Sequence, residues 1–178
     1  MAPVSDRELH HHIRGLKATR AYAADPLPER DLLDILEAGR WSGSSLNSQP
    51  WTFVVVTDPQ TKSDLSETGR YAAHLSVAPA VIVLVGAPGR GDFDLGRAAQ
   101  NMMLVADAAG IGSCPATLHD EESARRILGV PDDRSARHAL AFGYPDHEHE
   151  ATVRQNMKLV TGSARKPLSE VARWDRYA

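Results

Sequence analysis

Apolar residues along the chain follow two spacings, which predict alternating helices and strands. Apolar positions three or four residues apart indicate amphipathic helices, and short runs rich in β-branched and aromatic residues indicate strands. The predicted helices cover, in chain order, residues 5–17, 32–39, 60–67, 93–109, 120–128 and a last segment after Pro167. The predicted strands cover residues 51–57, 80–85 and 138–142.

Two of these segments are apolar on most of their surface and predict a buried centre. The strand 80–85 has no polar face and lies between Pro79 and Gly86, which is typical of a strand in the middle of a sheet. The helix 93–109 is apolar around most of its circumference and should also be central. We find neither an internal repeat nor a linker. The order of elements therefore predicts a single α+β domain over residues 1–178, with helices on both faces of the sheet.

The C-terminal region differs from the rest of the chain. Residues 146–166 are polar and show no clear periodicity, whereas the helix predicted after Pro167 holds three large apolar residues. Such a helix needs a surface on which to pack. We therefore expect the tail 146–178 to pack on a second subunit.

Composition and charge narrow the classes of function. The 178-residue chain has a formal net charge of -3, which offers no basic field to a nucleic-acid backbone. Its longest strongly apolar stretch, residues 77–85, is far shorter than the ~20 residues that cross a bilayer. The N-terminal residues lack the apolar core of a secretory signal, and the one cysteine, Cys114, cannot form an internal disulfide. We expect a cytoplasmic protein that binds neither nucleic acid nor membranes.

Four segments contain candidate binding residues, and each also has a purely structural interpretation. The loop 42–51 crowds short hydrogen-bonding side chains between a helix and a strand, which suits a binding site or a capped turn about equally well. Lys17 and Arg20 supply two cations that could bind a phosphate or complement a helix dipole. Residues 110–120 are predicted to form a tight loop after a helix. Arg165 lies in a basic stretch, and such stretches are usually solvated.

Together these segments resemble the nitroreductase family, both in sequence and in order. The loop resembles the family's Pro-Ser-Ser-x-Asn-x-Gln-Pro-Trp run, with Gly43 where the family more often has proline. The N-terminal segment resembles its Arg-Arg-Ser-x-Arg-x-Phe phosphate-binding segment, although Leu16 and Ala18 replace an arginine and a serine. Residues 110–120 are similar to the family's Gly-x-x-x-x-Pro segment, and residues 165–168 are similar to its closing basic patch.

The resemblance implies a three-layer α+β fold, with a central mixed sheet flanked by helices, in an intertwined homodimer with FMN at the interface. It also implies the residues that hold FMN, which are Lys17, Arg20, Gly43, Ser44, Ser45, Asn47, Gln49, Pro115, Ala116, Thr117, Leu118 and Arg165. The loop residues would reach the flavin from the neighbouring subunit. The backbone N–H groups of Thr117 and Leu118 would face flavin N5 and O4, where fixed donors stabilise developing negative charge. For the basic residue on the pyrimidine side of the flavin, Arg70 is a candidate by position.

The implied activity is flavin-based and needs no catalytic side chain. Hydride would pass from NADH or NADPH to flavin N5 and then to a nitroaromatic, a quinone or a similar small planar acceptor, in a ping-pong cycle. Two alternatives stay open: a non-enzymatic protein of the same fold that binds a flavin or another planar ligand, and a specialised biosynthetic reductase or dehydrogenase. No metal is expected, because the consecutive side chains His10–His12 fan out on a helix, and Cys114 is interpreted as a small packed residue.

Overall fold

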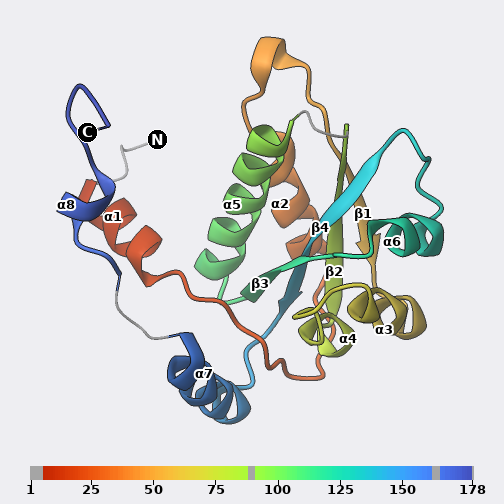
Figure 1. Ribbon diagram of the computed structural model, residues 1–178. Coiled ribbons are helices and arrows are strands. Elements are labelled where there is room, and N and C mark those ends of the chain that lie inside the picture. The colour runs from red at the N-terminus through yellow and green to blue at the C-terminus, as the bar shows by residue number, and fades with distance from the viewer. Residues whose placement is uncertain (1–5, 88–90, 162–164, 178) are drawn as a thin grey trace.

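Four antiparallel strands form the middle layer of the computed structural model, which describes residues 6–87, 91–161 and 165–177. The strands, in their spatial order, are β1 (Thr52–Val56), β2 (Ala80–Gly86), β4 (Ser135–Gly143) and β3 (Gly112–Thr117) (Figure 1). β1 and β3 are therefore the edge strands. The resemblance implies a mixed sheet, whereas all neighbouring strands here are antiparallel. Among the described residues, parallel pairing is limited to an isolated bridge between Ala18 and Ser113.

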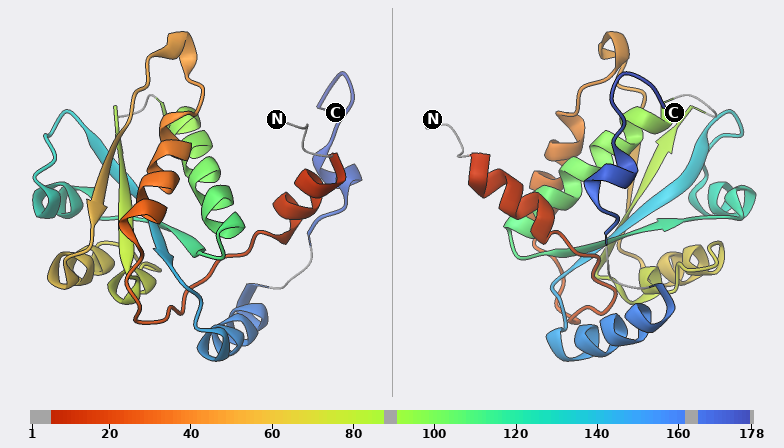
Figure 2. Two further views of the ribbon diagram at one scale, coloured as in Figure 1. Left: turned by 180° about the vertical axis from the view of Figure 1, so that it is seen from behind. Right: turned by 60° about the vertical axis from the view of Figure 1, so that its left-hand side comes forward.

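Helices cover both faces of the sheet, as the apolar pattern predicts (Figures 1 and 2). One face is covered by α2 (Glu29–Arg40) and α5 (Asp92–Ala108), and the other by α3 (Pro59–Glu67), α4 (His74–Val77) and α6 (Glu121–Leu128). Strand β2 is buried along its whole length. Its side chains alternate between the layers, with Ile82 and Leu84 in the core under α2 and α5 and Val81 and Val83 in the opposite core.

One segment differs from its predicted conformation. Residues 110–120, expected to be a loop, contain strand β3, which pairs with β4 from Gly112 to Thr117. Gly, Ser, Pro and Ala have weak strand propensity, so pairing with β4 and not the local sequence makes this segment extended. Pro115 is tolerated there because it lies on an edge strand, where an N–H that points away from the sheet needs no partner in the ladder.

The C-terminal region is more regular than its sequence indicates. Residues His147–Thr161 form α7, and a single turn, α8 (Leu168–Val171), follows Pro167. α7 contacts the N-terminal segment of its own chain through Glu150, and packing of the tail 146–178 on a second subunit stays a prediction. In α8 and the residues after it, Leu168 and Trp174 are exposed.

Helix α1 (Asp6–Gly15) lies apart from the sheet (Figure 1). It reaches α5 through His12, whose Nε2 lies 3.0 Å from the carbonyl oxygen of Leu104 and whose Nδ1 lies 3.5 Å from the carboxylate of Asp107. Of the helices in the described ranges, none is long and apolar enough to cross a membrane.

Residues 18 and 19 lie along the free edge of β3, and the chain then passes to the residues after β4, where Tyr22 forms a bridge with Pro145. The N–H of Thr19 donates a hydrogen bond to the carbonyl oxygen of Ser113 at 2.8 Å. Gly112 permits this close approach, because a Cβ atom at that position would lie 2.6 Å from the Thr19 side chain. The backbone before Arg20 is thereby fixed next to β3, and the backbone after it is fixed by Asp146, whose N–H donates to the carbonyl oxygen of Ala21 at 3.1 Å.

Helix α7 holds the same segment from the other side through Glu150, which is only 3% exposed. Its Oε2 accepts hydrogen bonds from the N–H groups of Arg20 at 2.7 Å and Ala21 at 2.9 Å. Its Oε1 accepts one from Nε of Arg154 at 2.8 Å. One buried carboxylate therefore satisfies two backbone donors and one guanidinium, and joins the N-terminal segment to the C-terminal helix.

We expect Glu150→Ala to lower the free energy of unfolding by about 2–4 kcal/mol, because it leaves two part-buried N–H groups and the guanidinium of Arg154 without this acceptor. Chemical denaturation followed by far-UV circular dichroism measures this change. Glu148→Ala is the matched control, since Glu148 is an exposed carboxylate on the same helix, and it should leave the free energy of unfolding near the wild-type value. Equal losses in the two variants would contradict this role of Glu150.

Candidate functional site

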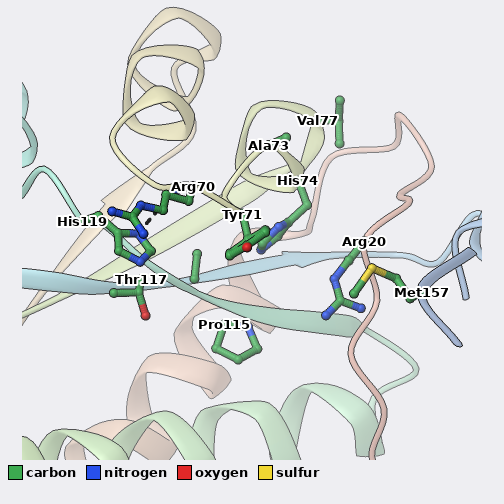
Figure 3. A pocket seen from close by; sticks show the side chains of 11 residues that line it. Arg20, Arg70, Tyr71, Ala73, His74, Val77, Pro115, Thr117, His119 and Met157 are labelled. Carbon is green, nitrogen blue, oxygen red and sulfur yellow. Dashed lines mark hydrogen bonds between the residues drawn. The ribbon is translucent and has the colours of Figure 1, made fainter. Parts of the chain in front are cut away.

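A pocket of about 730 Å³ lies between the N-terminal segment, the region of α4 and strand β3 (Figure 3). This volume is within the roughly 300–1,000 Å³ of sites that bind small molecules. Its walls include Arg20, residues 70–77 in part, Pro115–Thr117, His119 and Met157. A second pocket, of about 400 Å³, lies on the α5 side of β3 and shares Pro115–Thr117 with the first.

Arg20 lies at one end of the larger pocket. Its backbone is fixed by Glu150, while its side chain is half-buried and points into the pocket (Figure 3). Among the residues that the structure describes, its guanidinium has neither a hydrogen-bond nor an ion-pair partner. A fixed backbone and an unpaired cation make this residue suitable for binding an anionic or electron-rich group.

His74, the first residue of α4, is buried in the wall of this pocket at 7% exposure. Within the part of the chain that the structure describes, its Nε2 has no hydrogen-bond partner. Burial lowers the pKa of His74, and the positive charge of Arg20 lowers it further, against a weaker opposite effect of the backbone at Cys114 and Tyr71. The imidazole is therefore neutral at pH 7. Native proteins seldom leave a buried polar atom unpaired, so this nitrogen marks a place where a ligand can supply the partner.

Strand β3 forms the floor of the pocket, with Pro115 exposed and Thr117 half-buried. The N–H of Leu118 donates to the carbonyl oxygen of Arg137 at 2.8 Å. Hydrogen-bonded positions alternate along an antiparallel pair, so the N–H of the preceding residue, Thr117, points away from β4 toward the free edge. The expectation for Thr117 as an outward donor agrees with this register.

The expectation for Leu118 is corrected. Its N–H is used within the sheet, and its side chain is fully buried in the core beneath α3, α4 and α6. Neither the N–H nor the side chain of Leu118 is therefore available to the pocket. The sequence places it next to Thr117, but the alternation of an extended strand turns the two residues to opposite sides.

Within one chain, the structure brings together some of the predicted site residues and separates others. Arg20, Pro115, Ala116 and Thr117 line one pocket. Lys17 is exposed and does not line it. Arg165 is also exposed and outside the pocket lining, in the segment that leads to α8.

The loop that contains Gly43, Ser44, Ser45, Asn47 and Gln49 lies beyond the opposite end of the sheet from α4 and α7 (Figure 1). It includes the short helix η1 (Ser45–Asn47). Leu46, at its tip, is 100% exposed. The loop cannot take part in the pocket of its own chain, and its exposed polar side chains are available to a second molecule.

Helix α5 holds this loop in place. Nη1 of Arg97 donates to the carbonyl oxygen of Gly43 at 2.7 Å, and Nδ2 of Asn101 donates to Oγ of Ser42 at 2.7 Å. Beyond these bonds the backbone is left-handed, with φ of 52° at Asn47 and 47° at Gln49. Non-glycine residues adopt this conformation rarely, and such strained positions often occur at ligand sites.

Sequence reasoning missed the three residues of the pocket that carry an imidazole or a phenol ring, His74, His119 and Tyr71, and also missed Ala73, Val77 and Met157. His74 lies in a helix of four residues, which is too short to give a periodic signal. The burial of its imidazole, which marks it as a candidate site residue, depends on contacts with distant segments and cannot be seen in the local sequence. Arg70, which was considered only by position, does line the pocket.

Cys114, adjacent to the floor of the pocket, is a buried and unreactive thiol. It is 1% exposed, and burial raises its pKa to about 11. A thiol with this pKa is almost entirely protonated at pH 7 and is a poor nucleophile. Among the described residues, no group of three His, Cys, Asp or Glu side chains could hold a metal ion.

Comparison with known proteins identifies the family. The model of the Nitroreductase family matches residues 13–87 and 66–144, which include Arg20, His74 and Pro115–Thr117. An NADH dehydrogenase of Thermus thermophilus is 31% identical, over 89% of this chain and 91% of the relative.

Solved structures agree with this match. An FMN-dependent nitroreductase from Clostridium difficile is 26% identical and superimposes with a TM-score of 0.71, over 76% of this chain and 86% of that chain. Nitroreductase A from Vibrio parahaemolyticus, at 23% identity, has the same fold, with a TM-score of 0.81 over 95% of this chain and 76% of that chain. The chain therefore belongs to the nitroreductase family and is an oxidoreductase.

Proposed function

We propose that this protein is an FMN-dependent oxidoreductase that passes hydride from NADH or NADPH to a small planar acceptor, such as a nitroaromatic or a quinone. The observation that carries this proposal is the pocket that joins Arg20, His74 and Pro115–Thr117. The similar proteins support it, since one is called an NADH dehydrogenase and another an FMN-dependent nitroreductase.

The residues of the pocket suit this cofactor. Arg20 offers an unpaired cation to the phosphate or to an electron-rich edge of the ring, and the unpaired Nε2 of His74 offers a hydrogen-bonding position beside it. Pro115 and Ala116 present a surface without bulky side chains, and Thr117 presents an outward N–H. When bound, FMN supplies the redox chemistry. The protein's residues bind it, orient it and stabilise negative charge.

We further propose that a homodimer completes the site. Gly43, Ser44, Ser45, Asn47 and Gln49 would contact the flavin held by the other subunit, and Lys17 and Arg165 would add positive charge near its phosphate. The exposure of Asn47 and Gln49 and the left-handed backbone of this loop support the proposal. The exposed apolar residues of α8 and the segment after it are suited to pack on the second subunit.

The direct test is the absorbance spectrum of the purified protein, followed by release and identification of the chromophore. We expect flavin bands, one FMN per subunit, and loss of those bands on anaerobic mixing with NADH or NADPH. Addition of a quinone or a nitroaromatic should restore them. A protein that stays colourless after incubation with FMN would overturn the proposed function.

We expect Arg20→Gln to weaken FMN binding about 10- to 100-fold, because it removes a charge-assisted hydrogen bond. Titration of the flavin-free protein, followed by quenching of flavin fluorescence, gives the dissociation constant. Arg14→Gln is the control, since Arg14 is an exposed arginine of α1 outside the pocket lining. If both variants bind FMN with equal affinity, Arg20 does not hold the cofactor.

Mixed dimers test whether two subunits build one site. We expect Arg20→Gln and Asn47→Asp each to lose most of the bound flavin, and Asp tolerates the left-handed backbone at that position. Unfolding the two variants together and refolding them should restore about one quarter of the wild-type flavin, since half of the dimers are mixed and each has one intact site. Recovery no greater than that of the separate variants would show that Arg20 and Asn47 do not act across an interface.

His74 should make stability depend on pH. Because its pKa is lowered in the folded protein, the unfolded chain takes up the proton first as the pH falls. The free energy of unfolding should therefore decrease as the pH is lowered through about 6.5, the value for the unfolded chain. We expect His74→Gln to show a smaller decrease than the wild type between about pH 7.5 and about pH 5, in urea titrations. His10→Gln, which removes an exposed imidazole of α1, should retain the wild-type decrease, and parallel curves for His74→Gln and the wild type would refute this assignment.

A further inference from the structure

The charges in the walls of the larger pocket are of one sign. Of the described residues that line it, Arg20 and Arg70 carry guanidinium groups and none carries a carboxylate, while His74 and His119 add two imidazoles. Figure 3 shows Arg20 at one end, beside Met157, and Arg70 at the other, beside His119 and Thr117. The pocket therefore has two separate cationic ends.

The backbone of Arg70 is fixed by a hydrogen bond, but no acidic side chain neutralises the charge of its guanidinium in the described part of the chain. The backbone N–H of Arg70 donates to Nδ1 of His119 at 3.3 Å, which ties it to the residues that follow β3. The guanidinium itself has neither a hydrogen-bond nor an ion-pair partner in the described part of the chain. The carboxylate that follows His119, Asp120, is occupied as the cap of α6, where it accepts from the N–H of Ser123 at 3.0 Å.

An aromatic ring adjoins this cation. Tyr71 follows Arg70 directly, lines the same pocket and is 86% exposed, so its ring covers little of the protein's own core. Exposed arginines are common, and one alone would indicate nothing. Here the guanidinium shares a concave surface with an uncovered aromatic ring and no opposing acid, an arrangement that concentrates positive potential beside a flat apolar face.

We propose that Arg70 binds an oxyanion carried by the second ligand of the site, and that Tyr71 contacts the planar ring of that ligand. This proposal rests on the proposed function in one respect, namely that Arg20 at the opposite end serves the flavin. Two sources offer the same chemistry: the carboxylate of an aromatic acceptor and the phosphate of the nicotinamide donor. Both present oxygen pairs that match the fork of a guanidinium. Arg70 then makes the enzyme select anionic planar molecules over neutral ones of the same shape.

Calorimetry on the flavin-loaded protein can test this selectivity without turnover. The first pair of probes is para-nitrobenzoate and para-nitrobenzamide, which have similar shapes and differ in charge. The second pair is nicotinamide mononucleotide and nicotinamide riboside, which differ by one phosphate. We expect the wild type to bind the anionic member of at least one pair more tightly, and Arg70→Gln to weaken that binding about tenfold while changing the neutral member less than about twofold.

The identity of the affected pair separates the two sources. A loss confined to the benzoate pair assigns the oxyanion to the acceptor, a loss confined to the nicotinamide pair assigns it to the donor, and loss in both assigns a shared site. Arg126→Gln is the control, because Arg126 is an exposed arginine of α6 outside the pocket lining. The proposal is overturned if the wild type prefers neither anion, if Arg70→Gln keeps the preference, or if Arg126→Gln loses it equally.

This test is independent of the flavin test. If the protein does not take up FMN, the proposed function fails, but the two probe pairs can still be measured on the flavin-free protein and interpreted in the same way. If FMN binds and turns over, Arg70→Gln should also raise KM for para-nitrobenzoate about tenfold and raise KM for para-nitrobenzamide less than about twofold. A purely structural role for Arg70 would change both acceptors alike.

Discussion

Strand β2 must bury both of its faces, and the rest of the fold depends on this requirement. Val81 and Val83 need one layer of helices, and Ile82 and Leu84 need another. Full burial of one such side chain stabilises the folded state by roughly 1.5–3 kcal/mol, so neither layer is dispensable. With β1 and β4 beside β2, strand β3 is left at an edge. That edge is where the N-terminal segment docks and where the larger pocket opens.

The parts of the fold that follow from local pattern were predictable, and the parts that follow from distant contacts were not. The apolar run of β2 and the all-round apolar surface of α5 indicated a central strand and a central helix. β3 could not be recognised, because its small residues become a strand only by pairing with β4. α7 was missed for a similar reason: Glu150, which reads as one more charge in a polar segment, is the buried acceptor of two N–H groups.

In the candidate site, too, some residues could be predicted from local sequence and others depend on distant contacts. Arg20 and Pro115–Thr117 were identified from motifs, and they meet in one pocket. The loop from Gly43 to Gln49 came from the strongest motif, yet it lies away from that pocket in its own chain. Motifs preserve residue types and order but contain no information on which subunit supplies them. His74 had no motif, and only its burial with an unpaired nitrogen reveals it.

The contact between Glu150 and Arg20 joins positions 130 residues apart, and this separation matters while the chain is being synthesised. Residues 18–22 leave the ribosome early, but the carboxylate that receives their N–H groups emerges only after the whole sheet has been translated. The wall of the pocket therefore remains incomplete until α7 has been synthesised. A nascent chain can form its sheet and still lack a complete pocket wall, so cofactor loading has to wait for α7.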